Sequence, residues 1–150
     1  MRRLLIVLIL LMSVGSVPVN AAGSVSMTLA PGVVSPTQLV GRFNRYRIAH
    51  KIPGFNRWSP DLASQACAHA KHMAQRGYLY HNAIRASDWS RLGQIAGHIK
   101  SPTTRGLYDA YLASSLHRTA IRYPNATIVG DCAVHYHGRW FHVMNFKAPS

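Results

Sequence analysis

Between residues 59 and 82 the apolar positions recur every three or four residues, the spacing of one face of an α-helix. The stripe comprises Leu62, Ala66, Ala70 and Met73. Ser59 followed by Pro60 is typical of a helix start, because serine can cap free N–H groups and proline needs no partner there. Gly77 can adopt the left-handed conformation that commonly ends a helix. The pattern therefore predicts a core helix around which the domain packs.

Two further helices and a short strand are expected from similar patterns. Ser-Pro pairs at residues 35–36 and 101–102 predict one helix that runs to about His50 and another that reaches His117. Residues 93–97, GQIAG, form a short apolar run between two glycines. Such a run is either a strand or a place where the backbone closely approaches another group.

The C-terminal part of the chain changes to a period of two. Residues 127–136 are rich in β-branched side chains and alternate, residues 137–139 indicate a turn, and residues 140–146 alternate again. This pattern predicts a β-hairpin. Because helices come first and strands last, we expect an α+β fold in which helices flank a small antiparallel sheet.

The N-terminus has a composition unlike that of the rest of the chain. Two arginines precede an apolar run at residues 4–12, and a region of small residues follows. This is the pattern of a secretory signal peptide, which predicts a secreted, periplasmic or cell-envelope protein. The run is shorter than the roughly 20 residues that span a bilayer, and an uncleaved anchor is the alternative. We expect a signal peptide over residues 1–21, a flexible linker over 22–35 and one domain over 36–150.

The charge is strongly unbalanced. The chain has 17 Lys and Arg against 4 acids, none of them Glu, and a formal net charge of +13. A protein this basic associates with anionic surfaces such as phospholipid or acidic cell-wall polymers. The basic residues are densest between residues 42 and 57, and a solvated basic surface is the simpler interpretation. Nucleic acid is not expected as a partner, because no interleaved basic–aromatic motif is present.

Two cysteines, Cys67 and Cys132, are present. In an exported protein they are expected to form one disulfide, because the compartment is oxidising. The bond would join the core helix to a late strand. Two buried free thiols are the alternative.

Nine histidines are many for a chain of this size. His69 and His72 lie three residues apart on the core helix, as a metal-binding pair could. His135 and His137 share one strand face, and His142 could oppose them across the hairpin. Exposed or core histidines without a metal are the alternative in both cases.

The histidines at positions 81 and 117 differ, because each lies at or beyond a helix end near irregular chain. Around them the sequence resembles the CAP superfamily, or SCP-like extracellular domain, in its bacterial form, over about residues 37–146. The resemblance is carried by residues 44–81, by GQIA at 93–96, by YLASSLHR at 111–118, and by IVG at 128–130 with Phe146.

The resemblance implies a secreted, usually disulfide-bonded α–β–α sandwich. It also implies a cleft with two histidines and acidic partners, which in some members binds a divalent metal. Residue matching assigns the two histidines to His81 and His117, with Arg118 beside the second. The first acidic partner falls on Gln94, which cannot balance a cation. We therefore expect no cofactor, and only His81 and His117 as ligands of any divalent ion such as Zn²⁺.

Three functions are compatible with these residues. The first is a non-enzymatic binding module for a lipid, a sterol-like molecule or a cell-envelope component. The second is a hydrolase in which His81 and His117 act as an acid/base pair and Arg118 binds an anion. The third is a cationic adhesion protein for anionic envelope or host surfaces. Asp109 and Asp131, candidates for a missing acid, cannot be placed in the cleft from the sequence.

Overall fold

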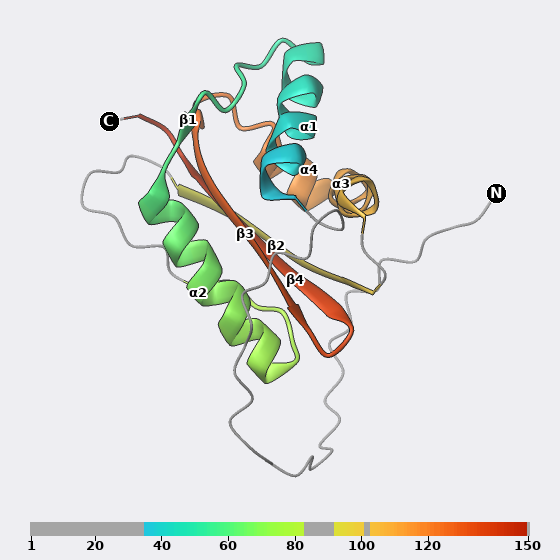
Figure 1. Cartoon of the computed structure of the whole chain (residues 1–150). Coiled ribbons are helices and arrows are strands. Elements are labelled where there is room, and N and C mark those ends of the chain that lie inside the picture. The colour runs from blue at the N-terminus through green and yellow to red at the C-terminus, as the bar shows by residue number, and fades with distance from the viewer. Residues whose placement is uncertain (1–34, 83–91, 101–102, 150) are drawn as a thin grey trace, which may run out of the picture.

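The computed structural model describes residues 35–82, 92–100 and 103–149 (Figure 1). The elements are α1 (Pro36–Ala49), β1 (Arg57–Trp58), α2 (Pro60–Arg76), β2 (Leu92–Lys100), α3 (Thr104–Ala113), α4 (Ser115–Ile121), β3 (Ile128–Tyr136) and β4 (Arg139–Lys147). The expected signal peptide, nearly all of the expected linker, and the Ser-Pro pair at 101–102 lie outside the described residues. Within the described residues, no helix is long and apolar enough to cross a bilayer.

The molecule has three layers, with helices on both faces of one sheet (Figure 1). The strand order is β1-β3-β4-β2, so the hairpin β3–β4 is central and β2 is an edge strand. Helix α2 covers one face, and α1, α3 and α4 cover the other. The α+β prediction is confirmed. The sheet is mixed rather than purely antiparallel, because the two-residue strand β1 pairs in parallel with β3.

The ends of the core helix are as predicted. The Ser59 hydroxyl accepts a hydrogen bond from the Leu62 N–H, and Pro60 occupies the first helical position. Gly77 adopts a left-handed conformation, with φ of 76°, and its N–H donates to the Met73 carbonyl. The same start occurs in α1, where the Ser35 hydroxyl accepts from the Gln38 N–H.

The single helix predicted from residue 101 to His117 is wrong in one respect, because the chain forms two helices. Ser114 is extended, with φ of −82° and ψ of 123°, and separates α3 from α4. Its hydroxyl accepts from the His117 N–H, a local bond by which serine competes with helix continuation. The Arg118 guanidinium donates to the Leu112 carbonyl at 2.5 Å. The break places His117 in the first turns of a new helix.

Alternation along β4 divides the core in two. Phe141 and Val143 pack with the alanines of α2 on one face. Trp140, Met144 and Phe146 pack with α1 and α3 on the other face. The nine residues of β2 are more than the five-residue run predicted for them, because β2 pairs along its whole length with β4.

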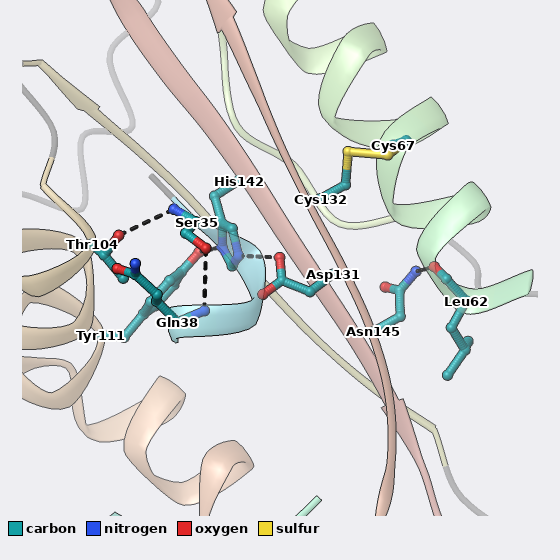
Figure 2. Close-up of polar contacts among 10 residues, drawn as sticks. All are labelled: Ser35, Gln38, Leu62, Cys67, Thr104, Tyr111, Asp131, Cys132, His142 and Asn145. Carbon is teal, nitrogen blue, oxygen red and sulfur yellow. Dashed lines mark hydrogen bonds and ion pairs between the residues drawn. A yellow bond between two sulfur atoms is a disulfide. The ribbon is translucent and has the colours of Figure 1, made fainter. Parts of the chain in front are cut away.

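Helix α2 is held against β3 at two points. At Gly130 an added Cβ would lie 2.2 Å from the Ala63 backbone nitrogen and 2.4 Å from the Leu62 Cβ. Only glycine allows the helix to approach the strand this closely. Further along, Cys67 and Cys132 form the predicted disulfide (Figure 2), with their Cα atoms 5.0 Å apart.

The opposite layer depends on Arg47, which is fully buried. Its guanidinium donates to the carbonyl oxygens of Pro53, Ile121, Tyr123 and Ala126, at 2.5–3.1 Å. It also lies over the Phe55 ring, 4.3 Å from the centroid. Burial lowers the pKa of Arg47 to about 10. Although Arg47 falls in the basic region at residues 42–57, it joins α1 to the end of α4 and does not contribute to the surface.

We expect Gly130→Ala to destabilise the domain by about 3 kcal/mol, because the methyl group must displace α2 from β3. Gly41→Ala is the matched control, since an added Cβ there meets nothing within 4 Å. In a helix interior this control should instead stabilise the protein by about 0.5–1 kcal/mol. Denaturant unfolding of both variants tests the pair, and equal stability of Gly130→Ala and wild type would contradict the close packing.

Candidate functional site

Three residues, His81, Gln94 and His117, form what we call the histidine site, and they come from three separate elements. His81 follows α2 in the segment after Gly77 and is exposed. Gln94 lies on the edge strand β2, and His117 lies on α4, which contacts β2. Gln94 and His117 are both half-buried. His81 and His117 thus come from the two helical layers, and both layers meet β2, the strand that carries Gln94.

The contact between His81 and Gln94 is a direct hydrogen bond. His81 Nδ1 lies 3.0 Å from Gln94 Oε1, and the Asn82 N–H donates to the same oxygen at 3.3 Å. Gln94 Nε2 donates to Asn82 Oδ1 at 2.8 Å and to Asn145 Oδ1 at 3.0 Å. Both the oxygen and the nitrogen of the Gln94 amide therefore have hydrogen-bond partners.

His117 packs edge-on against Tyr111, with ring centroids 5.0 Å apart and an interplanar angle of 78°. Burial lowers the pKa of His117, and repulsion from the positive form of His81 lowers it further. The roles of both histidines in binding remain predictions.

Behind His117 lies a buried chain of hydrogen bonds that the sequence did not lead us to predict (Figure 2). The Tyr111 hydroxyl lies 2.6 Å from His142 Nδ1, and His142 Nε2 lies 2.7 Å from Asp131 Oδ1. All three side chains are buried, and within the described residues Asp131 Oδ2 has no hydrogen-bond partner. Burial, with a smaller effect of the Asp131 charge, raises the pKa of Tyr111 well above its ordinary value.

The prediction that His142 opposes His135 and His137 across the hairpin is wrong in register, because His142 pairs with Ala133 and His135 pairs with Trp140. His142 points into the core, whereas His135 and His137 are exposed and His137 occupies the turn with φ of 45°. The alternation of β4 puts His142 on the same face as the buried Trp140 and Met144, a signal that could have indicated its burial. His135 shares this face, opposite Trp140, but lies close to the turn and is exposed.

His69 and His72, the pair on the core helix, are both hydrogen-bonded to Tyr80. His69 Nε2 lies 2.7 Å from the Tyr80 carbonyl oxygen, and His72 Nδ1 is hydrogen-bonded to the Tyr80 hydroxyl. Burial of His69 lowers its pKa. In the part of the chain that the structure describes, no group of three or more His, Cys, Asp or Glu side chains could hold a metal ion.

The other candidates serve local structure. Arg118 covers the end of α3 and Ser114 caps α4. Asp109 lies 3.6 Å from Arg105 on the exposed face of α3, and Asp131 is buried against His142. Of these four residues, Ser114 contacts the histidine site directly, through the backbone N–H of His117.

The histidine site does not fit the divalent ion that the family resemblance implies. Its donors are two imidazoles and an amide, with no carboxylate among them to balance a cation. The amide oxygen already accepts from Asn82 and faces His81 Nδ1. Zinc sites with carboxylate or thiolate ligands supply the charge that is missing here.

We expect Zn²⁺ to leave the melting temperature of the wild-type protein unchanged, because a ligand stabilises only a fold that binds it. Thermal unfolding over a Zn²⁺ titration tests this. A rise in melting temperature that His81→Ala or His117→Ala abolishes, and that His50→Ala after α1 does not, would contradict the misfit.

We also expect stability to depend on the protonation of His117. Because its pKa is lower in the folded state than the ordinary value near 6.5, the unfolded chain binds the proton first. The contribution of neutral His117 is therefore complete above about pH 6.5 and is lost as pH falls toward the folded-state pKa. In His117→Gln the free energy of unfolding should decrease less steeply as pH falls, by at most about 1.4 kcal/mol per pH unit. Denaturant unfolding across this range measures it, and an unchanged slope would contradict the assignment.

Comparison with known proteins supports the family resemblance found in the sequence. The family model described as CAP, the Cysteine-rich secretory protein family, matches residues 40–146. A search of the curated proteins finds no match.

Solved structures share the fold. An outer surface protein of Borrelia burgdorferi aligns with a TM-score of 0.65 and 12% identity, over 76% of this chain and 92% of that one. An extracellular protein of Bacillus anthracis that contains an SCP domain aligns with a TM-score of 0.61 and 21% identity, over 76% of this chain and 40% of that one. Venom allergen-like protein 4 of Schistosoma mansoni aligns with a TM-score of 0.55 and 14% identity, over 75% and 86%. At these identities the likeness concerns the fold alone. The family model covers most of the chain and the layered fold agrees with it, so this chain belongs to the CAP family, the Cysteine-rich secretory protein family.

Proposed function

We propose that this CAP domain is a secreted, non-enzymatic binding module that holds a lipid, a sterol-like molecule or another cell-envelope component at the histidine site. The proposal rests mainly on where apolar side chains are exposed. Among the described residues, the large hydrophobic side chains with the greatest exposure are Ile48, Trp58, Tyr78, Leu79 and Leu116. Three of these five belong to the two segments that carry the site histidines.

Leu116 directly precedes His117 and is 77% exposed, and Leu79 lies two residues before His81 and is 39% exposed. Exposed apolar side chains that gather near polar groups are typical of binding surfaces. The pair of segments therefore offers apolar contact area next to imidazole and amide hydrogen-bonding groups. A ligand with an apolar body and a polar head matches this composition.

The contacts of the neighbouring polar residues favour binding over hydrolysis. Ser114 caps α4, and Arg118 donates to the Leu112 carbonyl at the end of α3, so each of these residues has a structural role that accounts for its presence beside His117. Gln94 has an amide, which cannot act as an acid or a base, whereas glycoside hydrolysis usually requires two carboxyl groups in the site.

Adhesion to anionic surfaces is the second candidate. The chain has 17 Lys and Arg and only 4 acids, an excess of 17 − 4 = 13 positive charges, although one of them, that of Arg47, is buried. A surface of this charge attracts anionic lipid or polymer, and salt weakens the attraction.

We expect the wild-type protein to retain lipid after incubation with a bacterial-envelope lipid extract and gel filtration, as detected by mass spectrometry of an organic extract. Leu116→Ser should reduce the retained lipid about tenfold, the equivalent of 1.4 kcal/mol of binding energy. Ile48→Ser, which removes an exposed apolar side chain from α1, is the matched control and should retain it.

The adhesion candidate predicts a different result. In that case both variants would bind anionic vesicles equally, and raised salt would release them. Equal lipid retention by Leu116→Ser and wild type, together with salt-sensitive vesicle binding, would contradict the histidine site as the binding surface.

A further inference from the structure

Asn145, a residue to which the sequence assigned no role, lies at the centre of the polar contacts beneath His81. It is on β4, directly opposite Gln94 on β2 and opposite Gly130 on β3. Only 1% of its surface is exposed. Its Nδ2 donates to the Leu62 carbonyl of α2 at 3.2 Å (Figure 2), at the point where α2 packs against Gly130.

These contacts define which way each amide faces. A carbonyl oxygen can only accept, so the Asn145 group that faces Leu62 is its NH₂ group. The opposite group, Asn145 Oδ1, therefore faces Gln94 and requires a donor there. Gln94 meets it with Nε2 at 3.0 Å. At the other end, the backbone N–H of Asn82 requires an acceptor and meets Gln94 Oε1, which is the same orientation.

The orientation of Gln94 in turn determines which ring nitrogen of the neutral His81 carries the hydrogen. Gln94 Oε1 is an acceptor, so His81 Nδ1, 3.0 Å away, must carry the hydrogen of that bond. In the neutral imidazole, Nε2 then holds the free lone pair. His81 is exposed, and within the described residues its Nε2 makes no hydrogen bond to protein. The ring therefore offers solvent or a ligand a hydrogen-bond acceptor.

The same arrangement opposes a carboxylate at position 94. In place of Nε2, a glutamate would present an oxygen to Asn145 Oδ1 at 3.0 Å and to Asn82 Oδ1 at 2.8 Å. Asn145 cannot turn its NH₂ group toward that oxygen without placing Oδ1 against the Leu62 carbonyl. An unpaired buried acceptor of this kind is costly.

We propose that Asn145 is a positioning residue that specifies an amide at position 94 and, through it, the Nδ1–H form of His81. Gln94 and Asn145 thus form a pair of complementary amides across two strands. The amide at position 94, where the family resemblance implies an acid, is explained by this pairing. The inference concerns the free protein and is independent of the ligand that the site binds.

Long-range proton–nitrogen NMR of the His81 ring, at a pH where imidazole is neutral, tests the first half. In the wild type we expect a single form protonated on Nδ1. Gln94→Ala and Asn145→Ala should each admit the second form, protonated on Nε2. Asn125→Ala, which changes an exposed loop asparagine, is the matched control and should leave the spectrum unchanged. A wild-type ring protonated on Nε2, or an Asn145→Ala ring identical to wild type, would overturn the proposal.

A double-mutant cycle tests the second half. Gln94→Glu should lower the melting temperature by about 5 °C when Asn145 is present, and by less than half as much in the Asn145→Ala background, because the opposing oxygen is gone. Additive shifts would overturn the proposal, since they would mean that the two side chains act independently. Should Asn145→Ala not fold, Asn145→Ser replaces it in both experiments, and the wild-type spectrum remains decisive.

Discussion

The buried guanidinium of Arg47, which forms no ion pair with any acid among the described residues, holds the α1, α3 and α4 layer together. Burying a charge is costly unless hydrogen bonds replace its hydration, and the four carbonyl oxygens around Arg47 do this for its guanidinium. They belong to the loop after α1, to the last residue of α4 and to the segment that leads into β3. A helix of seven residues such as α4 is too short to be stable alone. Its C-terminal end is held by Arg47 and its N-terminal end by Ser114, so the position of His117 follows from contacts made elsewhere in the layer.

On the other face of the sheet, close packing and a disulfide, and not a buried cation, hold the helix in place. Helix α2 approaches β3 through the gap left at Gly130 and is joined to it by the disulfide. The segment that leaves α2 then reaches the edge strand, where Gln94 bonds His81. Each histidine therefore belongs to a separately stabilised layer, and β2 is the element they share. The relative position of the two histidines therefore depends on how each layer packs on the sheet and not on one helix alone.

Local patterns predicted much of the fold, because the interactions that end a helix or form a hairpin lie within a few residues of one another. Ser59 and Gly77 mark α2 correctly, and the alternation from residue 127 onward marks the hairpin. Ser114 was missed because one serine within an apolar helical pattern is a weak signal against continuation. In the candidate site, family resemblance singled out His81, Gln94 and His117. Asn145 was not found, because its contact with Gln94 depends on pairing between β2 and β4, which are some fifty residues apart. The Tyr111–His142–Asp131 chain was not found, because it depends on how α3 packs on the β3–β4 hairpin.

The strand order has a consequence for how the polypeptide acquires its structure. The two central strands, β3 and β4, follow every other element in the chain, so β1 and β2 have no neighbour to pair with until residues 128–147 have been made. The earlier helices must wait as well, since the apolar stripe of α2 packs on those strands and Cys67 has no partner before Cys132 exists. Assembly that depends on such distant pairing is slow and leaves apolar surface open to aggregation. In a growing chain of this sequence the apolar stripe of α2 therefore stays uncovered until the final hairpin has been made.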